Sequence, residues 1–356
     1  MHNRNTSIHI EPAALLHNLT FIKRQAPLAK VVAMVKANAY GCGIKQVIPT
    51  LEGNVDVFGV VTTGEALAIR KLGAQTPCLI IQGAFEPTDW QLAGQQNFIF
   101  AIHCPLQLNW LLNTPLAHPV TVWIKLNTGM NRLGLQPHEA KDIIQAVSQC
   151  PWVKKPVVLM THFANADSPA HPFNHQQYTE FNQLALAYPD TEKSLANSAA
   201  IFALPHTHAD YIRPGITLYG ISPFEQMTGI ELGLQPVMRF TSKLMHTYTI
   251  SAGDNVGYGS TWLAQRPSRL GLIPVGYGDG YPRVVQPNTP VWILGQTAPI
   301  VGRISMDTMV VDLTAMPEVA TNDPIELWGT HLPIERIAKA ANTIPYELLC
   351  KVLSRP

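Results

Sequence analysis

Eight short apolar runs, each followed by a stretch with helical character, occupy about 190 residues from Val31 onward. The runs that predict strands are Val31–Lys36, Val57–Val60, Cys78–Gln82, Phe98–Ala101, Val120–Leu126, Val157–Thr161, Lys193–Ala196 and Tyr211–Arg213. Eight strand-then-helix units with no strand left over predict a parallel (β/α)8 barrel. The alternative is a doubly wound open sheet. It predicts a glycine-rich phosphate turn after the first strand, but no GxGxxG motif follows Lys36.

Beyond Gly220 the pattern changes from strand–helix alternation to short strands separated by glycine-rich turns, with two short helices near the end. This change predicts a second, mainly β domain. We therefore expect an N-terminal strand in residues 1–11, the barrel in residues 12–230 and the β domain in residues 231–356. The sequence leaves open which of the two domains pairs with the N-terminal strand.

The 356 residues are 46% hydrophobic and 14% charged, with a formal net charge of +1. That balance is typical of a globular protein with a large core, and it gives no reason to expect nucleic acid or a membrane as partner. No apolar run approaches the roughly 20 residues of a bilayer span, and the N-terminus lacks the apolar core of a secretory signal. Because the five cysteines are scattered, we expect a cytoplasmic protein without disulfides.

Polar side chains stand at the ends of several predicted barrel strands, which share one rim in such a fold. They are Lys36, Lys125, His162, Asn197, Ser198 and Arg213. A lysine that closes a buried strand beside a glycine-rich turn suits a Schiff base with a carbonyl cofactor. Each residue also has an ordinary structural interpretation: a solvated lysine, a loop histidine or a helix cap.

The turns after the seventh and eighth strands are suited to a phosphate group. Ser198 offers a hydroxyl at the start of a predicted helix, whose free N–H groups favour an anion. Gly215 lets the backbone at Ile216 approach a ligand closely. A Schiff-base lysine opposite such a cradle fits pyridoxal 5'-phosphate. The glycine-rich run at 275–281 has the wrong spacing for a nucleotide loop and predicts a turn. The loosely spaced histidines lack acidic or cysteine companions, so we expect no metal site.

With these features the chain resembles the bacterial alanine racemases, which are fold-type III pyridoxal-phosphate enzymes. The resemblance covers nearly the whole length. It rests on AMVKANAYG around Lys36, LNTGMNRLG at 126–134, THFANAD at 161–167, ANSAA at 196–200, RPGITLYG at 213–220, VGYGST at 256–261, IPVGYGDGYPR at 273–283 and VGRISMD at 301–307.

The resemblance implies interconversion of L-alanine and D-alanine, which supplies D-alanine for peptidoglycan. Lys36 would hold the cofactor and act as the base on one face of the substrate. Tyr258, from the other subunit of a homodimer, would be the base on the opposite face. Racemisation needs two such groups, because a single base returns the proton to the face that it left.

The resemblance also implies roles for the surrounding residues. Arg213 would face the pyridine nitrogen, His162 would support Tyr258 together with Arg213, and Arg132 with the backbone N–H of Met306 would hold the substrate carboxylate. The phosphate would be held by Tyr40, Ser198, Gly215 and Ile216, next to Asn197. Lys125 matches a lysine that is carbamylated in some relatives and braces Arg132, and Asp307 and Tyr277 of the partner would lie near the site entrance.

Two departures from the relatives stand out. Asn127 replaces an aspartate that many relatives have. Ser354 stands where some relatives have a phosphate-contacting tyrosine, so it is left out of the predicted site.

Four other functions compete with this reading. They are a racemase of different or broader amino-acid specificity, a decarboxylase of the same barrel-plus-β class, a cofactor carrier built from the barrel alone, and a binding protein without catalysis. A decarboxylase predicts a catalytic cysteine pattern that the second domain lacks, and a carrier has no use for Tyr258. Serine, lysine or arginine turned over faster than alanine would favour the broader racemase.

Overall fold

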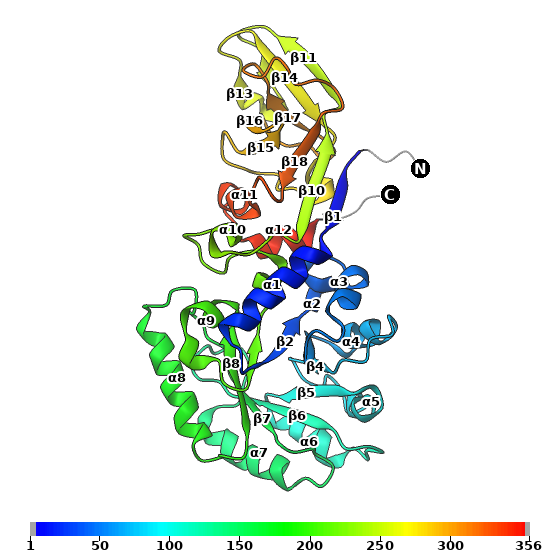
Figure 1. The fold of residues 1–356 in the computed structure, drawn as a ribbon, viewed down its shortest axis with the longest axis vertical. Coiled ribbons are helices and arrows are strands. Elements are labelled where there is room, and N and C mark those ends of the chain that lie inside the picture. Colours follow the sequence, from blue (N-terminus) through cyan, green and yellow to red (C-terminus); the bar gives the residue numbers. More distant parts are fainter. Residues whose placement is uncertain (1–4, 353–356) are drawn as a thin grey trace.

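A computed structural model describes residues 5–352 of the chain. Figure 1 shows two bodies stacked along the long axis, a barrel with surrounding helices at one end and a mainly β region at the other. Eight parallel strands close the barrel in chain order. They are β2 (Lys30–Met34), β3 (Val57–Val60), β4 (Cys78–Ile80), β5 (Phe98–Ile102), β6 (Thr121–Lys125), β7 (Val158–Met160), β8 (Glu192–Asn197) and β9 (Tyr211–Arg213). The predicted barrel is therefore confirmed, and the open sheet is excluded.

The barrel strands are apolar almost throughout because both of their faces are covered, one by the barrel interior and one by helices. Every residue of β5 is buried, and aromatic pairs fill the space around the strands, such as Trp90 with Phe100 at 5.1 Å between ring centroids. The helices of the barrel are α1 (Pro12–Gln25), α2 (Lys36–Tyr40), α3 (Ile44–Leu51), α4 (Thr63–Arg70), α5 (Asp89–Gln96), α6 (Pro105–Asn113), α7 (Pro137–Gln149), α8 (Pro172–Ala185) and α9 (Ser198–Ala203).

The β region is an eight-stranded sheet with the order β1-β10-β18-β15-β16-β17-β14-β11, plus a separate β12–β13 pair. Its strands are β1 (Ser7–Ile10), β10 (Met238–Lys243), β11 (His246–Ile250), β12 (Asn255–Val256), β13 (Trp262–Leu263), β14 (Ser268–Ile273), β15 (Pro290–Ile293), β16 (Gln296–Val301), β17 (Met309–Asp312) and β18 (Pro324–Trp328). The helices α10 (Gly229–Leu232), α11 (Ile334–Ala340) and α12 (Pro345–Lys351) lie between the sheet and the barrel (Figure 1).

The N-terminal strand, whose partner the sequence left open, belongs to this sheet. β1 pairs antiparallel with β10, with Ser7 opposite Thr241 and Ile10 opposite Met238. The chain therefore starts in the β region, builds the whole barrel and returns to the same sheet. This double connection joins the two bodies at both ends of the barrel sequence.

Three further observations bear on the sequence expectations. β2 ends at Met34, so Lys36 does not close the strand as predicted but opens the short helix α2. All five cysteines are free thiols. Within residues 5–352, no helix is both long enough and apolar enough to cross a bilayer.

Buried hydrogen bonds fix the exit from the barrel to the β region. The side chain of Asn18 donates to the carbonyls of Leu218 (3.1 Å) and Gln235 (2.8 Å) and accepts the N–H of Gln235 (2.8 Å). Gly220 follows Leu218 by two residues and has φ +81°. A Cβ added to Gly220 would meet the Gln235 carbonyl oxygen at 1.9 Å. The turn thus requires glycine for both its backbone conformation and its packing.

A pair of substitutions separates these two requirements. Gly220→Ala should lower the free energy of unfolding by about 3 kcal/mol or more, because a left-handed alanine and a backbone clash add together. Gly253→Ala should cost only about 1 kcal/mol, since Gly253 has φ +92° but nothing lies within 4 Å of its Cβ position. Urea denaturation of both variants measures the difference. Equal losses would show that the close approach at Gly220 adds nothing to stability.

Candidate active site

Lys36 lies on a strained backbone segment at the carboxyl end of β2. The four residues after it, 37–40, all have left-handed φ values between 52° and 55°, which cost non-glycine residues about 1–2 kcal/mol each. The turn is held by bonds from Gly41 N–H to the Ala37 carbonyl (3.0 Å) and from Ile44 N–H to the Asn38 side chain (3.0 Å). This unusual turn fixes the direction in which the lysine leaves the strand.

The amine of Lys36 is half-buried among other cations. Burial and the charge of Arg132 lower its pKa, while Glu65 and Cys350 oppose that shift. Arg132 itself is exposed, at the end of a loop ordered by Asn127, whose side-chain oxygen accepts the N–H groups of Gly129 (3.1 Å) and Asn131 (3.0 Å). A lowered pKa makes more of the free amine available as a nucleophile or a base.

Arg213, at the end of β9, is buried without a carboxylate. Within residues 5–352 none of its hydrogen-bond acceptors is a carboxylate: they are the Ser194 hydroxyl (2.7 Å), the carbonyls of Leu195 (3.2 Å) and Thr161, and the ring of His162. Burial lowers the pKa of Arg213 to about 10, which leaves it protonated at neutral pH. The positive charge is therefore fixed in place but not neutralised by an acidic side chain.

His162 lies beside this buried cation. A guanidinium nitrogen of Arg213 lies 3.4 Å from Nδ1 of His162. Because the guanidinium can only donate, Nδ1 must accept, which leaves the ring proton on Nε2. Burial, with Arg213 and Lys125 nearby, lowers the pKa of His162 well below its usual value, so the ring is neutral.

The residues predicted to hold a phosphate, Tyr40, Ser198, Gly215 and Ile216, lie close together. The Ser198 hydroxyl accepts the N–H of Gly215 (2.8 Å) and the hydroxyl proton of Thr217 (3.1 Å), so its own proton remains to be donated. A Cβ at Gly215 would lie 2.4 Å from the Tyr40 hydroxyl oxygen, which places that hydroxyl against the Gly215 backbone. Ile216 begins the 3-10 helix η2 (Ile216–Tyr219). Two hydroxyls and the start of a helix thus converge where an anion can bind.

Asn197 has a structural task at this place, since its side chain caps α9 by accepting the N–H of Ala200 (3.0 Å). The helix-cap interpretation of this residue is therefore confirmed. Tyr40 is held by stacking on Tyr219, with 4.9 Å between ring centroids, and Tyr219 donates its hydroxyl proton to the Met34 carbonyl (2.9 Å). The cradle is thereby packed against the base of the lysine turn.

The remaining predicted residues lie in the β region. Tyr258, in the 3-10 helix η3 (Tyr258–Ser260), is 70% exposed, and Met306 is 51% exposed. Backbone bonds from Tyr277 N–H to the Ser305 carbonyl (3.1 Å) and from Gly278 N–H to the Met306 carbonyl (2.9 Å) join two of the loops, and Asp307 is exposed beside them. Figure 1 places β13, which closely follows Tyr258, in the half of the β region remote from the barrel. In one chain β13 therefore lies well apart from α2, which begins at Lys36 (Figure 1).

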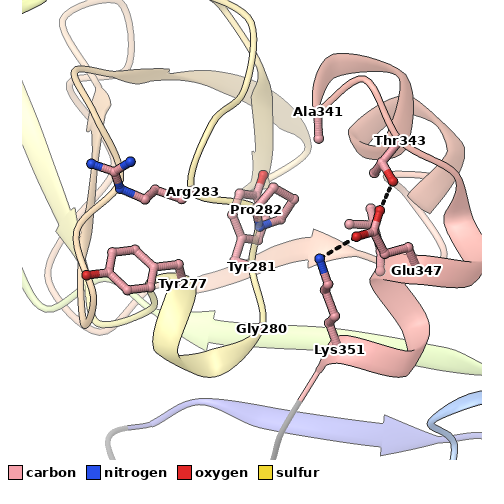
Figure 2. Close-up of a pocket in the computed structure, with 10 residues that line it drawn as sticks. Tyr277, Gly280, Tyr281, Pro282, Arg283, Ala341, Thr343, Glu347 and Lys351 are labelled. Atoms are coloured by element: carbon pink, nitrogen blue, oxygen red, sulfur yellow. Dashed lines mark hydrogen bonds and ion pairs between the residues drawn. The ribbon is translucent and has the colours of Figure 1, made fainter.

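A cavity of about 420 Å³ lies elsewhere, between the Tyr277 turn and α12 (Figure 2). An ion pair between Glu347 and Lys351 and a hydrogen bond from Thr343 to Glu347 form one wall. The buried hydroxyl of Tyr281 has no hydrogen-bond partner within residues 5–352. Of the predicted site residues only Tyr277 lines this cavity, so it is separate from the lysine and phosphate site.

Sequence reasoning missed one residue at the lysine turn. Glu65, on α4, accepts the N–H of Ala37 (2.8 Å), the residue directly after Lys36. The available signal was a T-x-x-E pattern at Thr62–Glu65, which predicts a helix cap and not a contact with the first barrel strand.

Ser354 lies outside the described residues. No group of three or more metal-ligating side chains occurs within the described range.

Fold and site together define a class of protein: a (β/α)8 barrel enzyme whose rim presents a half-buried lysine, a buried arginine and an anion cradle. Models of the alanine racemase N-terminal and C-terminal domains match residues 10–223 and 237–356. The chain belongs to the alanine racemase family.

Individual relatives match over nearly their full length. The chain is 50% identical to an alanine racemase of Legionella pneumophila over 99% of both chains, and 43% identical to the biosynthetic alanine racemase of Escherichia coli over 98% and 97%. Among solved structures, the Pseudomonas aeruginosa biosynthetic alanine racemase superposes with a TM-score of 0.95 at 39% identity over 99% and 98%. The Bartonella henselae alanine racemase, described with covalently bound pyridoxal phosphate, superposes with a TM-score of 0.88 at 28% identity over 98% of both chains.

The cationic site predicts a pH dependence of stability. Burial, with Arg213 and Arg132 nearby, lowers the pKa of Lys125 to about 8. The pKa of a lysine in the unfolded chain is about 10.4, so the unfolded state binds more protons between these values and the free energy of unfolding should rise with pH there. Lys125→Met should flatten this rise in urea denaturation from about pH 7 to about pH 10. The exposed Lys71→Met is the control, and an unchanged slope in Lys125→Met would contradict the prediction.

Proposed function

We propose that the protein interconverts L-alanine and D-alanine with pyridoxal 5'-phosphate as cofactor, as a cytoplasmic homodimer that supplies D-alanine for peptidoglycan. The observation that carries the proposal is the half-buried Lys36 beside a cradle made by Ser198, Gly215 and Tyr40, in a chain of the alanine racemase family. A solved relative described with covalently bound pyridoxal phosphate supports the cofactor.

The residues present fit this cofactor. The cradle offers hydroxyl and backbone donors to a phosphate, and the lack of a Cβ at Gly215 leaves room that a side chain would fill. Lys36 would bond covalently to the aldehyde carbon, and Arg213 would face the ring nitrogen, with Ile216, His162 and Asn197 around them. When bound, pyridoxal phosphate supplies an electron sink that eases removal of the α-proton from an amino acid.

The proton transfers fall to two side chains. Nζ of Lys36, once released by the substrate, would take or return the α-proton on one face. The hydroxyl oxygen of Tyr258 would do so on the other face. His162 supports this role, because its Nδ1 accepts from Arg213 and its Nε2–H is left to donate to the tyrosine oxygen. Acid–base groups on both faces are what inversion at one carbon requires.

The substrate would be held by its carboxylate. Arg132 and the backbone N–H of Met306 would bind it, with Lys125 bracing Arg132. The charge of Arg132 acts on both Lys36 and Lys125, which supports its place at the same site. Asp307 and Tyr277 would lie near the entrance.

A homodimer would complete the site. We propose that the β domain, residues 231–356, contributes to the active site of the partner's barrel, residues 12–230. Tyr258 and Met306 are exposed in the single chain. Aromatic and methionine side chains are enriched at protein–protein interfaces. Burial of this surface against the partner's rim would bring the second base to Lys36.

The competing function within the same chemistry is a racemase of different or broader specificity. Tyr40, Tyr277 and Met306 would leave little room beyond a methyl side chain, which favours alanine. The purified protein should show an absorption band near about 420 nm and form D-alanine from L-alanine. Faster turnover of serine, lysine or arginine than of alanine would favour the broader racemase. Absence of the band would exclude the cofactor chemistry altogether.

Variants of the two bases test whether each site is shared between chains. Lys36→Ala should lose the band and the activity, and Tyr258→Phe should keep the band while activity falls about 10²- to 10⁴-fold. Mixing the two variants after reversible dissociation should restore about a quarter of the parent activity, because half of the dimers are mixed and each mixed dimer has one intact site. A mixture as inactive as its components would place both bases in one chain.

A further inference from the structure

Glu65 binds the backbone at two strand ends instead of capping its own helix. It is the third residue of α4, whose N-cap Thr62 accepts the N–H of Glu65 (3.2 Å). One oxygen of its carboxylate accepts a hydrogen bond from the N–H of Val61 (2.7 Å). The other oxygen accepts one from the N–H of Ala37 (2.8 Å). One side chain thus ties the end of β3 to the residue that follows Lys36.

Two other glutamates of the chain show the ordinary arrangement for this position. On α7, Glu139 accepts the N–H of its own N-cap Gln136 (2.9 Å), and on α10, Glu231 accepts the N–H of its N-cap Thr228 (2.6 Å). Each closes a local capping box. Glu65 has the same place in its helix but also binds the segment that follows the neighbouring strand β2, so helix capping alone does not explain it.

We propose that Glu65 is a positioning residue for Lys36: its two-amide bridge fixes the left-handed turn and its charge acts on the lysine nitrogen. This inference rests on the proposed function, in which Lys36 carries the cofactor and acts as a base. Glu65 itself touches neither cofactor nor substrate in this role.

The turn needs such an anchor. Residues 37–40 all adopt φ values that non-glycine residues avoid, so the segment persists only where its surroundings hold it. On the other side, α12 packs against α2, and a Cβ at Gly41 would meet the Leu349 carbonyl oxygen at 2.0 Å. Glu65 and α12 therefore hold the turn after Lys36 from two sides, which fixes the position of Lys36 at the end of β2.

The carboxylate also balances the charges that face Lys36. Burial and Arg132 lower the pKa of Lys36, whereas Glu65 and Cys350 raise it, and the neighbouring Lys125 adds positive charge. Among residues 5–352, Glu65 is the carboxylate whose charge acts on this amine. Removing that charge should make the protonated form of the Lys36 nitrogen less favourable.

The test compares Glu65→Gln, Glu65→Ala and the matched control Glu139→Gln in the full-length holoenzyme. The first readout is the pH midpoint at which the visible band of bound pyridoxal phosphate changes. The second is hydrogen–deuterium exchange of the peptides that contain Ala37 and Val61. The third is kcat/KM, which should fall about 10- to 100-fold in Glu65→Ala, since a small displacement of a catalytic group costs that much.

Glu65→Gln should move the pH midpoint to a lower value and speed exchange at one of the two amides, because the amide side chain keeps only one acceptor oxygen. Glu139→Gln should leave both readouts at the parent values. A midpoint in Glu65→Gln equal to that of the parent would overturn the proposal even if exchange rises, because Glu65 would then be structural only. This variant keeps the test open if Glu65→Ala fails to fold.

Failure of the proposed function gives a different result. If no visible band forms in the parent protein, the cofactor chemistry is wrong. Two other measurements then decide the role of Glu65. They are hydrogen–deuterium exchange at Ala37 and the pH dependence of Lys36 labelling by an amine-reactive probe, read by mass spectrometry. Slower labelling at a given pH in the parent than in Glu65→Gln supports the positioning role, and equal labelling overturns it.

Discussion

The positive charge collected at the carboxyl end of the barrel is the constraint on which the rest of the site depends. The charges of Lys36, Lys125, Arg132 and Arg213 act on one another or on His162, and within the described residues Arg213 hydrogen-bonds to groups without negative charge. Buried charge without a counter-charge is costly, so this arrangement does not stabilise the protein by itself. Ligands that carry negative charge, as the proposed cofactor phosphate and substrate carboxylate do, would explain it.

The barrel supplies the rigidity that such a site needs. The acceptors of Arg213 come from the ends of neighbouring strands: Thr161 follows β7, while Ser194 and Leu195 belong to β8. The pairing of β8 with β9 shifts register between Ser194 and Asn197, which brings Asn197 opposite Arg213. Strand pairing therefore sets the guanidinium position, and the lysine turn and the Ser198 cradle are built on adjoining strand ends of the same rim.

Much of this followed from the sequence, because the determining patterns are local. Periodicity and apolar runs predicted the eight barrel strands, and the residues at their ends predicted the lysine, the arginine and the Ser198–Gly215 cradle. The left-handed turn at 37–40 was not predicted, since those residues carry no glycine to signal it. The long reach of Glu65 was not predicted either, because a T-x-x-E pattern describes a contact three residues away and not one 28 residues away. The strand partner of Ser7–Ile10 depended on tertiary packing, which composition does not encode.

The choice of a guanidinium at the Arg213 position has a chemical consequence for the proposed reaction. With a pKa of about 10, Arg213 donates hydrogen bonds at neutral pH but gives up no proton. A ring nitrogen facing it would stay unprotonated, so the ring would withdraw electrons less strongly than one paired with an acid. Charge left at the substrate α-carbon would then favour return of a proton to that carbon over transfer elsewhere. In the proposed homodimer, a base held by the barrel and a second base held by an exposed loop of the partner would use that preference to invert the carbon.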